Sequence, residues 1–299
     1  MVSPSARKAA ARTLKEERKH SERRACRAAL ISRGAFRYAH RLKPGENEVR
    51  QAIRRIAREH PRYGYLRAWA TLRREGMKVN HKRVHRVWKT EGLSLKRKRP
   101  GRRRHERSEI TRKAEWPNHV WSYDFMEDRT ERGRRIKILN IVDEYTRVCL
   151  ASRAEPSMGA RGVIETLERL SRTCGMPGHI RSDNGPEFAA KAVKRWIEER
   201  GAGTIYIEPG SPWENAYIES FNGKMRDECL NMEIFRNGQE ARHVIESWRK
   251  EYNERRPHSA LGWQTPSEFA TRAASVGRAT PSLHLQPPEQ PDTLSSQVV

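Results

Sequence analysis

Positive charge is concentrated in the first part of this 299-residue chain, and that segregation limits what the chain can fold into. Residues 1–114 contain 36 Lys and Arg against 10 Asp and Glu, a net charge of +26, whereas residues 115–299 contain 25 against 27. One core with an evenly mixed surface would not sort its charges in this way, so we expect a cationic module followed by a near-neutral domain. A polyanion is the natural partner of the first part. The alternative is a basic solvated surface without a specific partner.

Several classes of protein are excluded by the composition. No apolar run approaches the ~20 residues of a membrane span, and the first twenty residues lack the apolar stretch of a secretory signal. The four cysteines lie far apart and form no C-x-x-C pair, which argues against a disulfide framework and the usual zinc-finger spacings. We therefore expect a protein of a reducing, cytoplasmic compartment.

The beginning of the cationic part, residues 1–45, is predicted to be a basic helical segment. Short helices are expected over 22–30 and 35–41, and the Ser32 hydroxyl is placed to cap the second one. This outline of helix, break and helix fits half of a helix-turn-helix, and it fits a plain helical hairpin equally well.

A clearer pattern of three helices spans residues 46–93. Apolar residues recur at helical spacing over 48–60, 66–75 and 81–91. The second helix has Leu66, Ala70 and Leu72 as its apolar positions. Asn80 is placed to cap the third helix, which turns Val84, Val87 and Trp88 inward.

The outer face of that third helix is basic. It carries Lys82, Arg83 and Arg86, and a basic helix after a short turn suits the major groove of DNA. We therefore predict a helix-turn-helix-like domain that binds DNA through these three residues. The alternative is a small three-helix bundle with charged solubilising side chains.

The segments that flank the second domain are predicted to lack regular structure. Residues 94–114 contain ten Lys and Arg without hydrophobic periodicity, and form a basic linker. Its cations, Lys96 and Arg97 among them, are expected to contact DNA phosphates, which carry no base sequence; a solvated tether is the alternative. Residues 272–299 are predicted to form a disordered tail, because from residue 276 onward the chain is rich in Pro, Ser and Gln.

Residues 115–271 alternate between strand and helix patterns. Strands are predicted over 119–126, 135–142, 147–154, 178–182 and 204–207, and helices over 160–174, 188–201, 214–229, 240–253 and 265–271. The order βββαβαβα predicts an α/β architecture, with a mixed sheet flanked by helices.

Three carboxylates of this domain stand out by position. Asp124 interrupts the aromatic first strand, where an apolar residue would pack better. Asp183 ends the fourth strand before a Gly-Pro turn, at the edge where open α/β sheets bind ligands. Glu219 lies in the helix after the fifth strand. Each alone fits an ordinary hydrogen-bonded or solvated acid, but hard divalent cations in phosphoryl chemistry require such carboxylate oxygens.

Five segments of the chain together resemble the DDE superfamily of transposases and retroviral integrases, and most nearly the second-frame products of the insertion-sequence-three family. They are RYGYLRAWATLRREGMKVNHKRVHRVWKTEGL, WSYDFMEDRTERGRRIKILNIVDEYTR, RSDNGPEF, SPWENAYIESFNGKMRDECL and YNERRPHSALGWQTPSEF, and they span about residues 48–270. The spacing of 35 residues between Asp183 and Glu219 accompanies them. The resemblance implies a ribonuclease-H-like catalytic core.

The resemblance also implies a function. Asp124, Asp183 and Glu219 would be the catalytic residues and would bind two Mg²⁺ ions, for which Mn²⁺ substitutes, to cut and join DNA strands. Arg226, seven residues after Glu219, would hold a DNA phosphate, while a surface Arg paired with Glu219 or with Asp227–Glu228 is an equal alternative. The implied partners are the ends of an insertion element, target DNA, further copies of the chain and an upstream-frame protein with a helix-turn-helix and a leucine zipper; the implied location is the bacterial nucleoid.

Two other functions remain open at this point. A nuclease of the same fold would only hydrolyse DNA, and a catalytically silent regulator would only bind it. Among the remaining residues, Asp143 and Glu144 are expected to build a turn with Thr146 rather than to bind metal. Tyr217 either stacks on an unpaired base or packs in the core, and packing is favoured.

Overall fold

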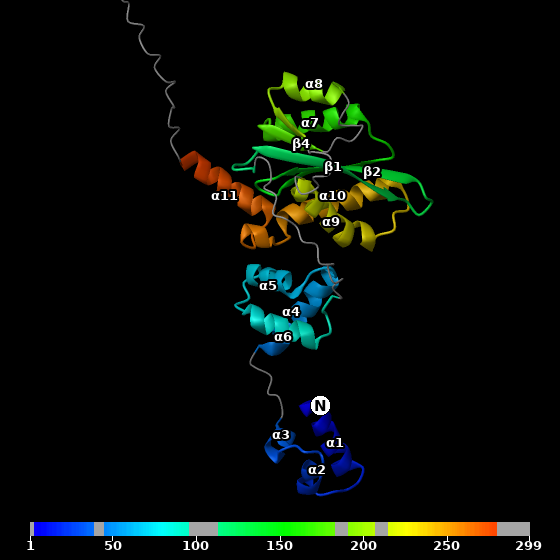
Figure 1. The fold of residues 1–299 in the computed structure, drawn as a ribbon, viewed down its shortest axis with the longest axis vertical. Helices are drawn as coiled ribbons and strands as arrows, with labels where there is room; N and C mark the ends of the chain where they lie inside the picture. The colour runs from blue at the N-terminus through cyan, green and yellow to red at the C-terminus, as the bar shows by residue number, and fades with distance from the viewer. Residues whose placement is uncertain (1–2, 39–44, 96–112, 183–190, 207–214, 280–299) are drawn as a thin grey trace, which may run out of the picture. The chain divides into compact units, whose positions relative to one another are not determined.

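The computed structural model describes residues 3–38, 45–95, 113–182, 191–206 and 215–279. Two compact units divide the chain, residues 1–52 and residues 53–299, and the boundary falls inside helix α4 (Glu46–Glu59). Figure 1 follows the order of the elements along the chain.

Serine caps organise the helices of the first unit. These helices are α1 (Pro4–Glu16), α2 (Glu22–Ala28) and α3 (Arg33–Arg37), and α1 was not predicted. The hydroxyl of Ser32 accepts a hydrogen bond from the backbone N–H of Ala35 at 3.1 Å, so the predicted cap of the second short helix is confirmed. Ser3 and Ser21 cap α1 and α2 in the same way.

The three predicted helices of the helix-turn-helix-like region are present as α4, α5 (Tyr65–Arg74) and α6 (His81–Thr90). The side chain of Asn80 caps α6 by accepting from the backbone N–H of Lys82 at 2.9 Å, as predicted. Of the three apolar positions named for α5, Ala70 and Leu72 are buried and Leu66 is 38% exposed. The buried residues of α5 are Ala68, Ala70 and Leu72, whereas Leu66 lies in the first turn of the helix.

The predicted mixed sheet is present and has the strand order β3-β2-β1-β4-β5. Its strands are β1 (Val120–Arg129), β2 (Arg135–Asp143), β3 (Cys149–Glu155), β4 (His179–Ser182) and β5 (Gly203–Tyr206). The first three strands pair antiparallel, whereas β4 pairs parallel to both β1 and β5. The long β1 therefore separates a meander from a parallel edge.

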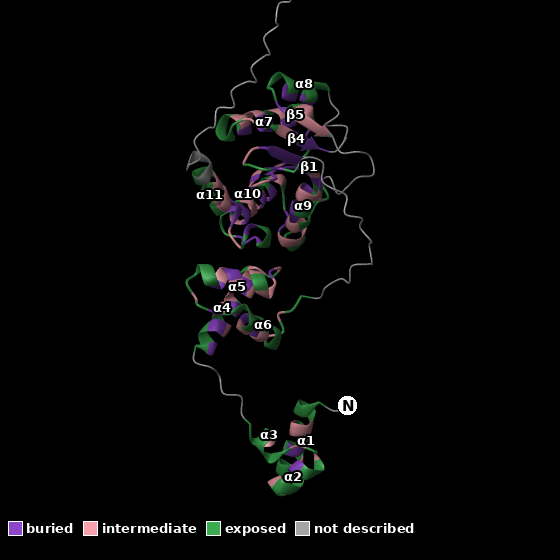
Figure 2. Ribbon diagram, turned by 60° about the vertical axis from the view of Figure 1, so that its left-hand side comes forward, coloured by how far each residue is buried: buried purple, intermediate pink, exposed green. Residues whose placement is uncertain are grey.

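Helices cover both faces of the sheet (Figure 1). On one face α7 (Ala160–Cys174) and α8 (Lys191–Glu199) pack on Trp121 and Tyr123 of β1. On the other face α9 (Ala216–Glu228) and α10 (Gly238–Glu254) pack on Met126. Buried residues are concentrated in the strands between these helical layers (Figure 2).

The last described helix, α11 (Pro266–Ala279), is longer than predicted. The disordered tail predicted over 272–299 is therefore wrong for its first eight residues, which are rich in alanine and continue the helix. Glu268 and Thr265 form a capping box: the Glu268 carboxylate accepts from the Thr265 N–H at 2.9 Å, and the Thr265 hydroxyl accepts from the Glu268 N–H at 3.2 Å. Arg74 of α5 also binds both oxygens of Glu268, at 2.5 and 2.7 Å.

Candidate active site

Asp124 lies on the face of the sheet that α9 covers. Successive side chains of a strand point to opposite faces, and Trp121 and Tyr123 pack into the core beneath α7 and α8. Asp124, like Met126, therefore faces α9. Its carboxylate is half-buried, in the middle of a strand that is otherwise mostly apolar.

Two buried amides hold the Asp124 carboxylate. Nδ2 of Asn222, on α9, donates to Oδ2 of Asp124 at 2.9 Å. Nδ2 of Asn140, the cross-strand partner of Asp124 on β2, donates to Oδ1 of Asn222 at 2.8 Å. Because the donor of Asn140 requires an oxygen acceptor, it turns the NH₂ group of Asn222 toward the acid. The sequence reasoning missed this pair, although a polar residue within Ile138-Leu139-Asn140-Ile141 was a usable signal.

The same contact brings the helix that carries Glu219 to Asp124. Glu219 is exposed on the first turn of α9. It precedes Asn222 by three residues, about one turn or ~4.5 Å along the helix axis, so the two side chains lie on one face. The structure therefore brings Glu219 within one turn of the residue that binds Asp124.

Asp183 lies outside the described residues, and its place beside the other two carboxylates stays a prediction. The strand before it is described: β4 ends at Ser182, and Arg181 pairs with Ser122 of β1, two residues before Asp124. Within the described ranges no three His, Cys, Asp or Glu side chains gather closely enough to hold a metal ion. Asp124 and Glu219 supply the carboxylate oxygens that Mg²⁺ prefers, so the donor chemistry fits this ion.

A fully buried ion pair lies beside the end of β4. Nε of Arg181 donates to Oε1 of Glu144 at 2.9 Å, and both side chains are 0% exposed. Burial raises the pKa of Glu144 to about 7, against the lowering effect of Arg181. Asp143 accepts backbone N–H bonds within the following turn, including that of Thr146 at 3.2 Å, so the structural role expected of these two acids is supported. The sequence reasoning did not identify Arg181.

Arg226 pairs with an acid that the sequence reasoning did not name. Its Nη1 lies 3.2 Å from Oδ2 of Asp128, and its Nη2 donates to the backbone carbonyl of Glu127 at 2.7 Å. The predicted alternatives were Glu219 or Asp227–Glu228, but α9 packs along β1, and the end of β1 supplies the nearer acid. The Arg226 side chain is still 40% exposed.

The predicted DNA-contacting residues of α6 lie around its outer side. Lys82 is exposed, and Arg83 and Arg86 are half-buried. The residues predicted to face inward are all buried: Val84, Val87 and Trp88. Lys96 and Arg97 lie outside the described residues, so their contact with phosphates stays a prediction.

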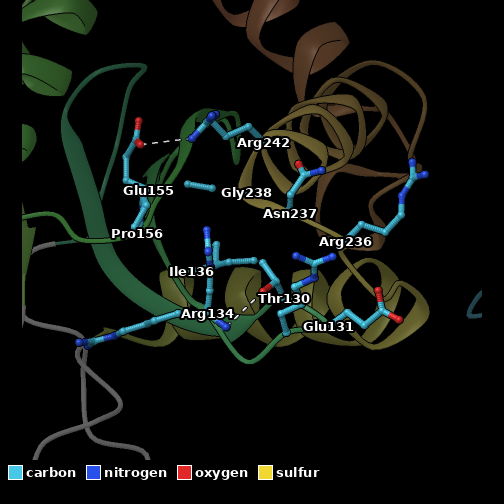
Figure 3. Close-up of a pocket in the computed structure, with 13 residues that line it drawn as sticks. Thr130, Glu131, Arg134, Ile136, Glu155, Pro156, Arg236, Asn237, Gly238 and Arg242 are labelled. Atoms are coloured by element: carbon cyan, nitrogen blue, oxygen red, sulfur yellow. Dashed lines mark hydrogen bonds and ion pairs between the residues drawn. The ribbon is translucent and has the colours of Figure 1, made fainter.

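A cavity of about 520 Å³ lies between the β1–β2 hairpin, the end of β3 and the start of α10 (Figure 3). Two of the arginines that line it pair with acids: Arg242 lies 3.4 Å from Glu155, and Arg236 lies 2.9 Å from Glu240. Figure 3 shows Glu155 and Arg242 pointing toward each other across the cavity. Because Asp124 and Glu219 do not line it, this cavity is separate from the candidate active site.

Known families match most of the chain. Two matches described as an integrase core domain cover residues 114–212 and 200–266, and an HTH-like domain covers residues 44–101. Within the described ranges, none of the helices has the length and apolar character needed to cross a bilayer.

Curated relatives are similar over at least four fifths of their own length. The 31.7 kDa protein of insertion element IS407 from Burkholderia multivorans is 42% identical over 89% of this chain and 96% of that protein. The 39.2 kDa protein of IS476 from Xanthomonas euvesicatoria is 38% identical over 94% of this chain and 82% of that protein. Transposase InsD of IS2 from Escherichia coli is 27% identical over 78% and 81%. The chain therefore belongs to the insertion-element transposases that combine an HTH-like domain with an integrase core.

Proposed function

We propose that Asp124, Asp183 and Glu219 together form the catalytic site of this transposase and bind two Mg²⁺ ions. The observation that carries the proposal is the bond between Asn222 and Asp124, because it brings the helix of Glu219 to the strand of Asp124. Mg²⁺ held by these carboxylates would activate the attacking oxygen and stabilise the leaving one.

The reaction is an in-line attack on a phosphodiester. Water attacks first, the bond between phosphorus and the 3′ oxygen breaks, and the 3′ end leaves with a hydroxyl. That hydroxyl then attacks a phosphodiester of the target and displaces its 3′ oxygen in turn, so the number of phosphodiesters is conserved in the joining step. No covalent bond between protein and DNA is formed, and the residues of the site position the strands and stabilise charge.

Charge-neutral variants test the three carboxylates separately. Asp124→Asn, Asp183→Asn and Glu219→Gln keep the shape of each side chain but remove the charge that binds a hard cation. We expect each to abolish Mg²⁺-dependent cleavage and joining of end-sequence duplexes, with an unchanged melting temperature. Glu199→Gln, at an exposed acid of α8, is the matched control and should cut normally. Cleavage by a purified variant would remove that residue from the site.

The DNA-binding residues are proposed from their positions. From α6, Lys82, Arg83 and Arg86 would contact base edges. In the linker, Lys96 and Arg97 would contact phosphates. Arg226 would release Asp128 and bind a phosphate near Glu219 instead. This assignment is supported by the basic outer side of α6 and by the exposure of Arg226. Under it the protein functions on the nucleoid in the cytoplasm, as an oligomer on DNA, with an upstream-frame protein as partner. Strand transfer with and without that partner tests the last point.

The same proposal extends to the domain boundaries. Residues 46–93 would bind DNA, 94–114 would link them to a catalytic core over 115–271, and 1–45 would add basic helices. Limited proteolysis tests this, since cleavage should concentrate in 94–114. A hydrolysis-only nuclease is the alternative that strand-transfer assays exclude or confirm.

A further inference from the structure

The motif around Arg256-Pro257-His258 has no role in the chemistry proposed so far, yet it forms one wall of a cavity. This cavity of about 410 Å³ lies between α9, the turn after β2 and the segment after α10. Of the thirteen residues that line it, four are Lys or Arg and none is acidic. The four cations are Arg67, Arg147, Lys224 and Arg256.

Two of these guanidinium groups are held in place by one acid. Nε and Nη2 of Arg256 each bind the Glu228 carboxylate at 2.6 Å, and Nη1 of Arg67 lies 3.2 Å from it. Arg256 is only 2% exposed, so its position is fixed by packing as well. One carboxylate thus balances two cations, and Arg256 still presents Nη1 toward His258, at 3.5 Å.

The other two cations have neutral neighbours. The guanidinium carbon of Arg147 lies 3.7 Å from the ring centre of Tyr217. The ammonium of Lys224 donates to the hydroxyl of Ser220 at 2.6 Å and to its carbonyl at 3.0 Å. Within the described part of the chain, no carboxylate lies within ion-pair distance of Lys224.

The potential in the cavity is accordingly positive. Burial lowers the pKa of Lys224 to about 8, and the nearby charges of Arg256, Arg67 and Arg147 contribute to the decrease. A bound anion would offset the unfavourable free energy of holding these cations close together in a buried place. The cavity offers such an anion an ammonium, guanidinium groups and a hydroxyl as donors.

We propose that this cavity binds a backbone phosphate of the DNA. The cavity lies on a different side of α9 from Glu219: Ser220 is about 100° and Lys224 about 140° around the helix axis from it, and Lys224 is about 7.5 Å from Glu219 along that axis. A cavity of 410 Å³ also accepts more than an isolated phosphate, as a sugar-phosphate unit requires. The proposal rests on the function proposed above only in taking DNA as the ligand.

Binding measured in EDTA tests the assignment without strand cleavage. The full-length chain is titrated with end-sequence duplex at 50 and 200 mM salt, as the wild type, as Lys224→Gln and as Lys250→Gln. Lys250 is an exposed lysine of α10 that does not line the cavity, so its variant removes the same charge elsewhere. Loss of one phosphate contact lowers the log–log salt slope by about 0.9. The affinity falls by some factor between 50 and 200 mM salt, and this factor should therefore be ~3.5-fold smaller for Lys224→Gln than for the wild type. For Lys250→Gln it should equal the wild-type factor.

A scan with single methylphosphonates then locates the contact, because each replaces one charged phosphate by a neutral group. We expect one position at which the substitution weakens binding by the wild type and has no further effect on Lys224→Gln. An unchanged salt slope together with no such position would overturn the proposal. If Lys224→Gln does not fold, as judged by its melting curve, Ser220→Ala is scanned in its place. This variant removes a hydroxyl and no charge, so its salt slope should match that of the wild type, and the absence of a methylphosphonate position that affects only the wild type would overturn the proposal.

A free anion is the competing ligand. If inorganic phosphate raises the melting temperature of the wild type saturably, and Lys224→Gln loses this effect but keeps the wild-type salt slope with DNA, the site takes free phosphate and the proposal is wrong. These binding results do not depend on catalysis. Cleavage by the carboxylate variants would refute the proposed catalytic site and leave the phosphate site standing.

Discussion

Replacing Asn222 with alanine is expected to impair catalysis more than folding. The substitution removes the 2.9 Å bond to Asp124 and leaves the buried Nδ2 of Asn140 without its 2.8 Å acceptor. The Nδ2 group of Asn140 then keeps only the weak acceptor Sδ of Met225, at 3.4 Å. A buried donor without a good acceptor costs about 1–3 kcal/mol, so the free energy of unfolding should fall by up to that amount in urea titrations. Loss of a group that orients a metal ligand typically reduces metal affinity or activity by about 10- to 100-fold. We expect that reduction in the cleavage rate of end-sequence duplexes, partly recovered at high Mg²⁺ concentration.

Asn140→Ala is the matched comparison. It removes one buried bond but leaves the bond between Asn222 and Asp124, so its stability loss should be similar and its cleavage loss smaller. The double variant should show a coupling of about 0.5–3 kcal/mol, because the two amides act in series. A folded Asn222→Ala that cleaves at the wild-type rate at every Mg²⁺ concentration would refute the reasoning. Equal cleavage losses in both single variants would attribute the effect to stability alone.

Three further predictions concern other parts of the chain. Glu144→Ala should lower the free energy of unfolding by about 3–5 kcal/mol in urea, because it leaves the buried guanidinium of Arg181 without its acceptor, and a Glu144→Met/Arg181→Met pair should restore most of it. The affinity for DNA should decrease as the pH rises through about 8 in the wild type but not in Lys224→Gln, because Lys224 is protonated, and attracts phosphate, only below its lowered pKa. The charged groups that face it are Arg67, Arg147, Arg256 and Glu228. Arg83→Ala should reduce the preference for the element's own ends over scrambled duplexes by about 1–3 kcal/mol, whereas Lys96→Ala should weaken binding to both duplexes equally; equal losses for Arg83→Ala would mean that α6 does not read bases.

Local signals predicted the elements that depend on neighbouring residues. The helix over 160–174 begins and ends where predicted, because its apolar spacing is regular and Gly175 follows with a φ of +82°, a conformation that glycine adopts without strain. Asn80 predicted the start of α6 for the same reason. Leu66 is exposed although it shares its helix face with the buried Ala70, because helical spacing does not say how far along a helix the core extends.

The candidate site was predicted in part. Asp124 stood out because an acid is a poor choice within an apolar strand, and Glu219 stood out because of its distance from Asp183. The groups that orient them did not, since Asn222 is 98 residues from Asp124 in the sequence and only the crossing of α9 over β1 brings them together. The ion pair between Arg181 and Glu144 was not predicted for a related reason. It depends on the order of the strands in the sheet, which the spacing of residues along the sequence does not encode.

The capping box of α11 gives one carboxylate two tasks. Glu268 closes the first turn of that helix through Thr265 and at the same time binds the guanidinium of Arg74 at the end of α5. A change that detaches Arg74 also alters the hydrogen-bonding geometry available at the helix start, so the docking of α5 and the winding of α11 are thermodynamically linked, and the linkage is reciprocal. If a ligand separates α5 from Glu268, the first turn of α11 should fray. Truncation of α11 should in turn weaken the docking of α5. Glu268 is thus one of several acids that join the HTH-like region to the integrase core, together with Glu228, which binds Arg67.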